Sequence, residues 1–293
     1  MSSLHDRLSD DKPILLDGAT GTELARRGVS LPPGLWSADS LRSDPEIVKQ
    51  IHADYIEAGA EWITTNTFRT HRRSLAKAGL GEEAPELTRQ AVALAREAVG
   101  KALAPVWVAG SLAPLEDCYR PEDVPEDSAL EKEHAEMAQH LADAGVDLIL
   151  VETQNTIREA VHATKAAVTT GVPTAVSFVC GNDAKLLSGE SLTDAVYAVL
   201  RYDPIAILVN CLPARAVPDA LKELKHAAGD RPVGVYANTG EYHPQTGWTG
   251  TPMEQPQNYA KAAAVWRGMG AKILGGCCGT TPEHIRLIRD VVM

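Results

Sequence analysis

The sequence predicts a (β/α)8 barrel of the TIM type, and three observations predict it. Eight short apolar runs rich in β-branched residues recur along the 293-residue chain. Each run is nearly continuous instead of alternating, which is typical of parallel strands that are covered on both faces. Alanine-rich amphipathic segments separate the runs, and no Ser/Gly-rich linker divides the chain. We therefore expect a single α/β domain over residues 1–293, with its active site at the C-terminal ends of the strands.

The expected strands and helices alternate along the chain. The strands are expected at residues 14–17, 62–66, 106–111, 147–152, 174–179, 205–211, 233–238 and 272–277. Helices can be delimited at residues 86–102, 128–144 and 191–200. The first carries a buried stripe formed by Leu87, Ala91, Leu94 and Ala98. Ser128 and Ser191 suit the N-caps of the other two, and Thr20 or Thr22 suits a cap after the first strand. Helix ends are expected at Gly59, Gly145, Gly171 and Gly270.

Composition and charge exclude several classes of protein. The chain has 28 Lys and Arg against 39 Asp and Glu, a net charge of −11 that argues against a nucleic-acid partner. The longest apolar run is residues 195–200, far short of a membrane helix. The first residues carry three Asp and no apolar stretch, so they do not form a signal peptide. Five cysteines are too few for a disulfide scaffold. We expect a cytoplasmic protein with small-molecule substrates.

Polar residues fall where the expected strands end, and in a barrel these ends meet around one axis. The residues are Asp17, Asn66, Glu152, Cys211, Asn238, Cys277 and Cys278. The Pro-rich loops at residues 112–127 and 239–257 follow the third and seventh strands, so they are expected at the same end. Asp17 with Glu152 in one bowl favours binding of a cationic group such as a substrate ammonium. The turn after Asp17 has no GxGxxG or Walker pattern, so a nucleotide site is disfavoured.

The adjacent pair Cys277 and Cys278 is best explained as part of a thiolate cluster for a soft metal. Consecutive Cα atoms lie about 3.8 Å apart, too close for ordinary disulfide geometry. With Cys211, the pair supplies three sulfurs and leaves a fourth position open, as in a catalytic zinc site. Three sulfurs suit a sulfur-containing substrate, because soft ligands occur together. The alternative is buried cysteines beside a tight glycine turn. Cys118 and Cys180 have no assigned role, although Cys180 could form part of the wall of the site.

Over its whole length the sequence resembles the homocysteine S-methyltransferase family. The motifs DGATGTEL, TNTF, VET, VNC and GGCCGTTPEHI stand in the family's order, and LWSA at residues 35–38 is similar to the cobalamin-independent branch that uses S-methylmethionine or S-adenosylmethionine. The resemblance implies Zn²⁺ on Cys211, Cys277 and Cys278. It implies that Asp17 and Glu152 hold the amino group of homocysteine. The backbone near Gly18, with Asn66 and Asn238, is expected to complete the substrate site.

The sequence departs from other branches of this family at several points. Only 15 residues follow Cys278, so the C-terminal extension of the betaine-using branch is missing and a monomer is expected. Thr153 stands where that branch prefers an aromatic residue, which argues against betaine. No cobalamin or folate module is present. The expected reaction is therefore methyl transfer from a sulfonium donor to the zinc-bound thiolate of homocysteine, giving methionine.

Several alternatives stay open. The acceptor could be selenocysteine or another small thiol, and the donor a methylated corrinoid protein. A non-catalytic zinc or redox-sensing protein is a further alternative, but it has no need of the ammonium pocket. A cysteine hydrolase lacks a Cys–His pair, because His243 and His284 are expected at the surface. Cation–π contacts could hold the donor, although each aromatic residue in the loops also suits packing; the candidates are Trp36, Tyr119, Tyr242 and Trp248.

Overall fold

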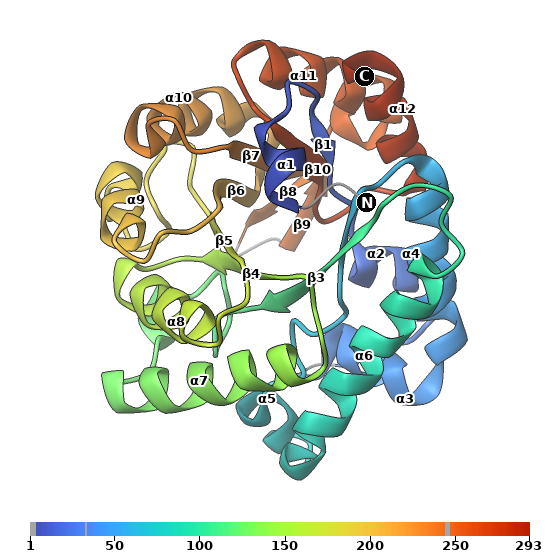
Figure 1. Ribbon diagram of the computed structural model, residues 1–293, viewed down its shortest axis with the longest axis vertical. Coiled ribbons are helices and arrows are strands. Elements are labelled where there is room, and N and C mark those ends of the chain that lie inside the picture. The colour runs from blue at the N-terminus through green and yellow to red at the C-terminus, as the bar shows by residue number, and fades with distance from the viewer. Residues whose placement is uncertain (1–3, 33, 244–246) are drawn as a thin grey trace.

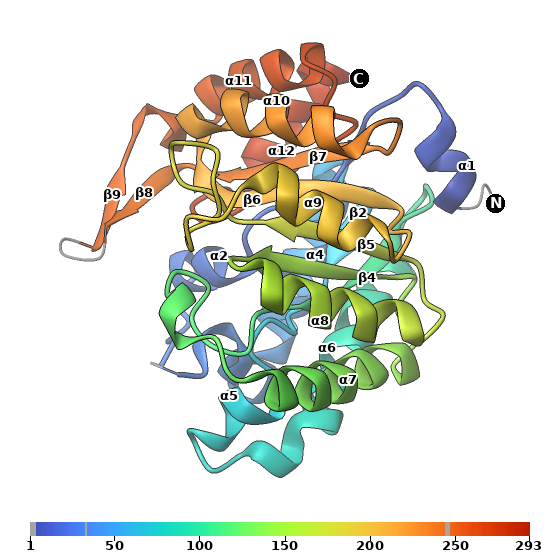
Figure 2. The ribbon, with the colours of Figure 1, turned by 90° about the vertical axis from the view of Figure 1, so that its left-hand side faces the viewer.

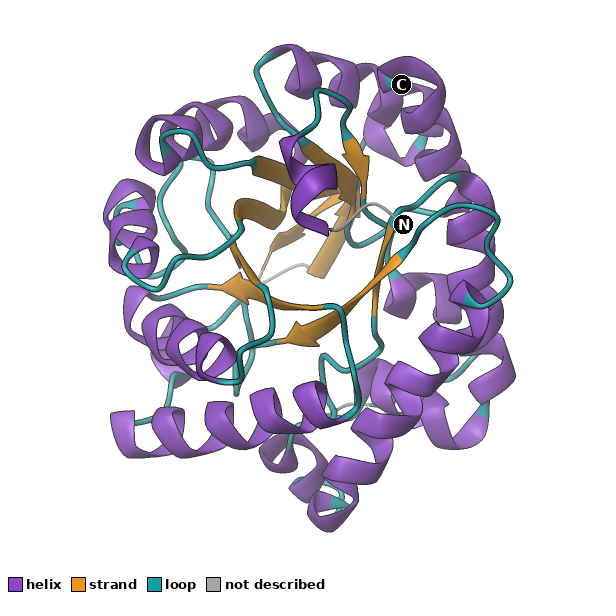
Figure 3. Ribbon diagram, in the orientation of Figure 1, coloured by secondary structure: helices purple, strands orange, loops and turns teal. Residues whose placement is uncertain are grey.

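The computed structural model describes residues 4–32, 34–243 and 247–293, with the backbone alone at 242 and 243. Its centre is a sheet of eight parallel strands rolled into a barrel. Helices form an outer ring around the barrel (Figure 1, Figure 3). The predicted (β/α)8 architecture is confirmed.

The barrel strands follow the order β1-β10-β7-β6-β5-β4-β3-β2. They are β1 (Ile14–Leu15), β2 (Trp62–Thr64), β3 (Trp107–Leu112), β4 (Leu148–Gln154), β5 (Thr174–Phe178), β6 (Ala206–Pro213), β7 (Val233–Asn238) and β10 (Ile273–Gly276). A parallel bridge between Leu16 and Trp62 joins β1 to β2. The backbone hydrogen bonds Glu61 N to Leu15 O (2.7 Å) and Asp17 N to Trp62 O (3.0 Å) complete this closure.

Helices connect the successive barrel strands, with one further helix before β1 and one after β10. The α-helices are α1 (Leu4–Ser9), α2 (Thr20–Arg26), α3 (Ser40–Ser43), α4 (Pro45–Ala58), α5 (Arg72–Ala76), α6 (Ala84–Val99), α7 (Asp127–Asp143), α8 (Ile157–Thr169), α9 (Leu192–Leu200), α10 (Val217–Ala228), α11 (Pro256–Gly268) and α12 (Pro282–Val292). Short 3-10 helices are η1 (Trp36–Asp39), η2 (Gly81–Glu83), η3 (Pro121–Asp123), η4 (Ala214–Ala216) and η5 (Pro252–Glu254). The predicted stripe of α6 is buried at all four positions. None of the described helices is long and apolar enough to span a bilayer.

The predicted helix caps are partly confirmed. Ser191 is the N-cap of α9, and its side chain accepts the N–H of Asp194. The prediction for Ser128 is wrong: α7 begins after Glu126, and the Ser128 hydroxyl donates to the Glu126 carboxylate at 3.0 Å. Gly59 ends α4 with a φ of 111°, in the left-handed region that favours glycine.

Inside the barrel, side chains change from apolar to polar toward the C-terminal ends of the strands. Leu148 and Leu150 of β4 belong to the apolar interior cluster, whereas Glu152 lines a pocket above it. On β2, Trp62 belongs to the same cluster and Thr64 lines the pocket. Because strand side chains alternate between the two faces, residues two apart share the inward face. The apolar side chains therefore fill the interior of the barrel below the pocket, and the polar side chains form the floor of the pocket.

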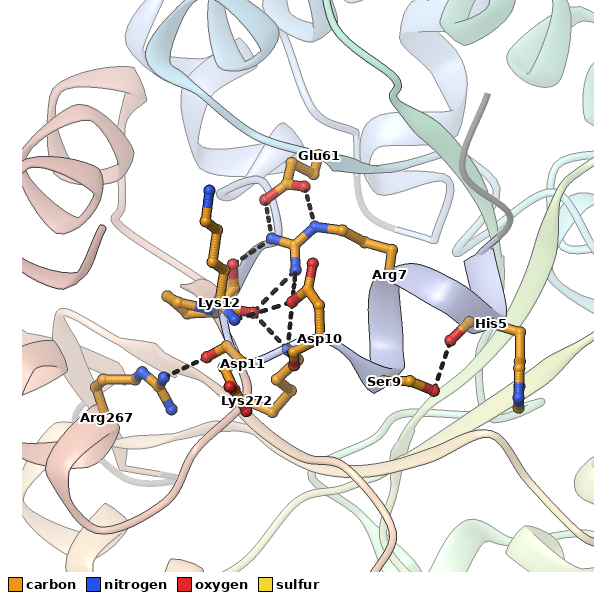
Figure 4. A network of polar contacts seen from close by, with 10 residues as sticks. His5, Arg7, Ser9, Asp10, Asp11, Lys12, Glu61, Arg267 and Lys272 are labelled. Carbon is orange, nitrogen blue, oxygen red and sulfur yellow. Dashed lines mark hydrogen bonds and ion pairs between the residues drawn. The ribbon is translucent and has the colours of Figure 1, made fainter.

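The N-terminal helix α1 covers the opposite end of the barrel (Figure 1, Figure 2). Leu8 packs into the interior cluster, and its neighbour Arg7 anchors the helix. The Arg7 guanidinium donates from Nε and Nη2 to the two carboxylate oxygens of Glu61, at 2.6 and 2.7 Å (Figure 4). It also donates from Nη1 to Asp10 at 2.8 Å. This bidentate pair ties the segment before β1 to the segment before β2.

An antiparallel hairpin projects from the C-terminal end of the barrel (Figure 2). Its strands are β8 (Gly240–His243) and β9 (Gly247–Gly250), within the second predicted Pro-rich loop. The indole of Trp248 packs on Gly240, where a Cβ would lie 2.5 Å from the ring. Both predicted loops reach the pocket, since Tyr119 of the first loop and Trp248 of the second line it.

Candidate functional site

A pocket of about 790 Å³ opens at the C-terminal end of the barrel. Residues from most of the strand ends line it, as expected for this fold. Seven of the metal- and substrate-binding residues predicted from the sequence line the pocket: Asp17, Gly18, Asn66, Glu152, Cys211, Cys277 and Cys278. The barrel therefore gathers residues that are far apart in the sequence around one cavity.

Cys211, Cys277 and Cys278 form a cluster at one side of the pocket. Their Sγ atoms all lie within 4.8 Å of one another, and those of Cys211 and Cys277 are in contact. Cys211 reaches this position through a left-handed backbone with a φ of 53°, at a register shift between Asn210 and Pro213. A tetrahedral zinc ion with Zn–S distances of about 2.3 Å would hold its sulfurs roughly 3.8 Å apart. The Sγ atoms of Cys211 and Cys277 lie at bonding distance, closer than this spacing, so the three cysteines would hold such an ion in their reduced form and leave a fourth position open.

Asn238 positions the backbone of the cysteine cluster. Its Nδ2 donates to the carbonyl of Cys211 at 2.8 Å, and its Oδ1 accepts the N–H of Cys278 at 3.1 Å. Asn238 is not among the described residues that line the pocket. Burial raises the pKa of the Cys278 thiol to about 11, so this thiol depends on a bound cation to become a thiolate at neutral pH.

Asp17 and Glu152 bring two buried carboxyl groups to the pocket. Asp17 accepts from the N–H of Thr64 at 2.7 Å and from its hydroxyl at 3.0 Å. Glu152 accepts from the Ser111 hydroxyl at 2.5 Å and from the Tyr236 hydroxyl at 3.0 Å. Burial raises the pKa of both carboxyl groups, and the charge of Glu152 raises that of Asp17 further. A cation beside two such carboxyl groups stabilises their ionised forms.

Three residues that hold these carboxylates were not predicted from the sequence. Thr64, Ser111 and Tyr236 each donate to a site carboxylate, and all three line the pocket. A signal was present for Thr64 and Ser111, because both are hydroxyl residues near the end of an apolar run. Tyr236 carried no such signal, since a tyrosine inside a strand is ordinarily read as core packing.

Gly18 and Asn66 shape the pocket next to Asp17. A Cβ at Gly18 would lie 2.6 Å from the Tyr55 hydroxyl, so the close approach requires glycine. The Asn66 amide donates to the carbonyl of Ser37 at 2.8 Å and to the Ser40 hydroxyl at 3.2 Å. Asn66 therefore fastens η1 and the start of α3 to the pocket wall.

The turn after Asp17 uses its threonines differently from the prediction. Ala19 is the N-cap of α2 and its side chain makes no cap bond, so neither Thr20 nor Thr22 caps this helix. The Thr22 hydroxyl instead accepts the N–H of Gly279 at 3.0 Å. This bond joins α2 to the turn that follows Cys278.

The aromatic candidates surround the mouth of the pocket. Trp36 and Trp248 line it and keep 45% and 42% of their surfaces exposed. Tyr119 also lines it, and its hydroxyl lies 3.4 Å from the carbonyl of Cys211. The side chains of Tyr242 and His243 fall outside the described residues.

The remaining cysteine and histidine predictions have different outcomes. Cys118 is buried and lines the pocket. Cys180 is buried on a bridge to Leu186 and is not among the described lining residues, so the structure does not place it in the wall. The prediction that His284 lies at the surface is wrong. It is 2% exposed and forms a capping box with Thr281 at the start of α12.

Comparisons with known proteins show which family the sequence matches. Residues 14–292 match the profile of the family described as homocysteine S-methyltransferase. The chain is 32% identical to homocysteine S-methyltransferase YbgG of Bacillus subtilis, over 94% of this chain and 93% of that protein. It is 33% identical to homocysteine S-methyltransferase of Escherichia coli, over 94% of each chain. It is 28% identical to selenocysteine methyltransferase of Astragalus bisulcatus, over 96% of this chain and 93% of that one.

Solved structures show the same likeness. The metallated form of the homocysteine methyltransferase MmuM from Escherichia coli superposes with a TM-score of 0.82 at 30% identity. The oxidised form of that protein superposes with a TM-score of 0.83, also at 30% identity. Each match covers 96% of both chains.

Proposed function

Because the chain belongs to the homocysteine S-methyltransferase family, it is a methyltransferase, and we propose that it carries a methyl group from a sulfonium donor to the thiol sulfur of homocysteine. The observation that carries the proposal is the juxtaposition, in one pocket, of the three-cysteine cluster with the buried pair Asp17 and Glu152. The cluster suits the thiol of an amino acid, and the carboxylates suit its ammonium group.

Asp17 and Glu152 bind the ammonium group of homocysteine in this proposal. Both carboxyl groups have raised pKa values in the free protein, so a cation between them favours the ionised forms. Their hydrogen bonds from Thr64 and Ser111 fix their orientation before substrate binds. The backbone at Gly18 lines the pocket beside Asp17, and we assign it to the same substrate.

The cysteine cluster activates the substrate thiol. Zn²⁺, when bound to Cys211, Cys277 and Cys278, supplies the positive charge that lowers the pKa of a thiol in the open position. Asn238 keeps the cysteine backbones in place through its bonds to Cys211 and Cys278. The thiol proton leaves to solvent, and the homocysteine sulfur then forms a bond to the methyl carbon. The methyl–sulfonium bond breaks, its electron pair stays on the donor sulfur, and the products are methionine and a neutral thioether.

The mouth of the pocket suits a cationic donor. Asp117 lines it, and no cationic side chain among the described residues lies within ion-pair distance of its carboxylate. Trp36 and Trp248 present partly exposed indole rings at the same opening. Carboxylate and aromatic faces both attract a sulfonium, and S-methylmethionine or S-adenosylmethionine would supply one.

Selenocysteine is the second candidate acceptor. The observation that favours it is the relative from Astragalus bisulcatus, which is named a selenocysteine methyltransferase. A selenol is also a soft ligand, so the same cysteine cluster would suit it. Competition between homocysteine and selenocysteine at equal concentration, read as the ratio of methylated products, separates the two acceptors.

The test measures zinc content by atomic emission and methionine formation from homocysteine with S-methylmethionine. We expect about one zinc per chain in the wild type, and loss of both zinc and activity in Cys277→Ser. The matched control is Cys180→Ala, which changes a buried cysteine outside the pocket lining and should keep zinc and turnover. Zinc without turnover by any sulfonium donor would favour a corrinoid donor or a metal sensor. Activity without zinc under reducing conditions would refute the proposal.

A further inference from the structure

Three cationic side chains line the pocket in the described part of the chain, and they differ in their partners. Lys77 lies 2.5 Å from a carboxylate oxygen of Glu116. Arg120 lies 3.0 Å from Asp123. Arg69, by contrast, has no carboxylate among the described residues within ion-pair distance, although it is half-buried. A cation that is partly removed from water without an anion beside it is costly unless a ligand supplies the anion.

Arg69 is held in place by two contacts. Its Nη1 donates to the backbone carbonyl of Glu116 at 3.0 Å, and its Cζ lies 5.3 Å from the centre of the Phe68 ring. Phe68 also lines the pocket. The single bond to Glu116 engages one of the five N–H donors of the guanidinium, so most of the fork stays open for a ligand.

The position of Arg69 suits contact with the methyl donor better than contact with the acceptor, homocysteine. The charged groups assigned to homocysteine, Asp17 and Glu152, lie in the buried layer at the strand ends. Arg69 instead bonds to the 112–127 loop, which also supplies Asp117 at the mouth. Arg69 and Asp117 therefore place at the mouth a cation and an anion that have no ion-pair partner among the described residues, a combination complementary to a zwitterionic amino acid.

We propose that Arg69 binds the carboxylate of the methyl donor and so determines which sulfonium compounds serve as donors. The inference rests on the proposed function and adds a residue that recognises the donor. A sulfonium without a carboxylate would be repelled by the guanidinium. A carboxylate on the same molecule replaces that repulsion with two parallel N–H···O bonds, the geometry for which guanidinium is suited.

The experiment compares S-methylmethionine with its carboxamide as donors to homocysteine. We expect the wild type to prefer the carboxylate donor roughly ten- to a hundredfold in kcat/KM, the usual effect of a charge-assisted hydrogen bond. In Arg69→Gln the ratio of the two kcat/KM values should fall to about one. Activity with S-methylmethionine should decrease, and activity with the carboxamide should stay the same. The KM for homocysteine should not change, and Arg69→Lys should recover part of the preference.

Arg73→Gln is the matched control. Arg73 lies on α5, close in sequence to Arg69, but it is paired with Glu133 at 2.6 Å and is not among the described lining residues. Its replacement should leave the donor preference intact. Retention of the preference in Arg69→Gln would overturn the inference, as would a rise in the KM for homocysteine with the donor preference unchanged.

Calorimetric titration with S-methylmethionine separates failure of this inference from failure of the proposed function. Binding that weakens tenfold or more in Arg69→Gln supports the inference even where no methyl transfer to homocysteine occurs. Equal binding by the wild type and Arg69→Gln, or no binding by the wild type, overturns it.

Discussion

The side chain of Asn210 makes two hydrogen bonds to Thr153, which lies on a strand that is not its neighbour. Its Oδ1 accepts the N–H of Thr153 at 3.1 Å, and its Nδ2 donates to the Thr153 hydroxyl at 2.8 Å. The intervening strand joins the network, since Ser177 donates to the same Oδ1 at 2.7 Å. Thr153 follows Glu152, and Asn210 precedes Cys211. The network therefore fixes the ends of two strands relative to each other, and these ends carry the residues proposed to bind the ammonium group and the metal.

This network also supports two unusual backbone conformations. Thr153 has a φ of 62° and Cys211 a φ of 53°, and the strand register shifts at both places. Non-glycine residues in this region cost of order 1–3 kcal/mol each and persist only where the surroundings hold them. The hydrogen bonds of Asn210 offset that cost.

We expect Asn210→Ala to weaken both folding and metal retention. The substitution leaves the buried N–H of Thr153 and hydroxyl of Ser177 without their acceptor, which should lower the free energy of unfolding by about 2–4 kcal/mol. Urea denaturation and zinc content after dialysis measure the two effects. The control Asn258→Ala removes a half-buried side-chain amide whose one hydrogen bond among the described residues is to the carbonyl of Pro252, and it should change either quantity little. Unchanged zinc retention in Asn210→Ala would contradict the positioning role.

The sequence predicted the strands well because burial on both faces leaves a continuous apolar run. It predicted their ends less well. The first strand was expected over residues 14–17, but β1 is Ile14–Leu15, and Leu16 forms only a bridge. The β8–β9 hairpin was not predicted, because the pairing of Gly240 with Gly250 depends on two segments that a Pro- and Gly-rich loop does not reveal.

The sequence predicted those pocket residues that can be recognised by their residue type and their position at the end of a strand. The cysteines, Asp17 and Glu152 follow from that rule. Asn210 does not, because its role depends on a register shift that turns its side chain toward Thr153. Arg69 could not be predicted from residue type and strand-end position either. Its lack of an ion-pair partner among the described residues depends on the pairing of the nearby carboxylates, and Glu116 is paired with Arg73 and Lys77.

Asp17→Asn should make the free protein more stable at pH 7 and a poorer enzyme. Burial raises the folded-state pKa of Asp17, so the folded protein holds a proton that the unfolded chain has released. The wild type therefore loses stability as the pH rises above about 3.8 toward that raised pKa, and the asparagine variant does not. Below about pH 3.8 the two should have similar stability. The KM for homocysteine should rise about tenfold or more, since the ammonium loses a carboxylate partner.

Urea denaturation at pH 3.5 and pH 7 and steady-state kinetics test this trade-off. Asp230→Asn, on an exposed turn, is the control and should show neither effect. A variant that is less stable than the wild type at pH 7, or that binds homocysteine equally well, would show that Asp17 does not carry the assigned role.

Arg7→Ala should destabilise the fold without affecting homocysteine binding. Arg7 is largely buried, and its loss leaves the Glu61 carboxylate and the carbonyl of Pro13 without their donor among the described residues at the base of the barrel. Breaking such a pair costs about 3–5 kcal/mol when fully buried, and somewhat less here because Glu61 is 21% exposed. Arg286→Ala breaks an exposed pair with Glu283 and should cost under about 1 kcal/mol. Thermal denaturation compares them, and equal losses would refute the anchoring role of Arg7.

Homocysteine should protect the metal from chelation. A metal held by the three cysteines would keep an open position for a chelator until the substrate thiol filled it, and the proposed contacts of Asp17 and Glu152 with the ammonium group would keep that thiol in place. The rate of zinc transfer to a coloured chelator should therefore fall at least tenfold at saturating homocysteine. Homoserine, which replaces the thiol by a hydroxyl, should protect much less, because a hydroxyl is a harder ligand. Asp17→Asn should need more homocysteine for the same protection. Equal release with and without homocysteine would favour a metal sensor, since an enzyme that binds its acceptor at this cluster must cover it.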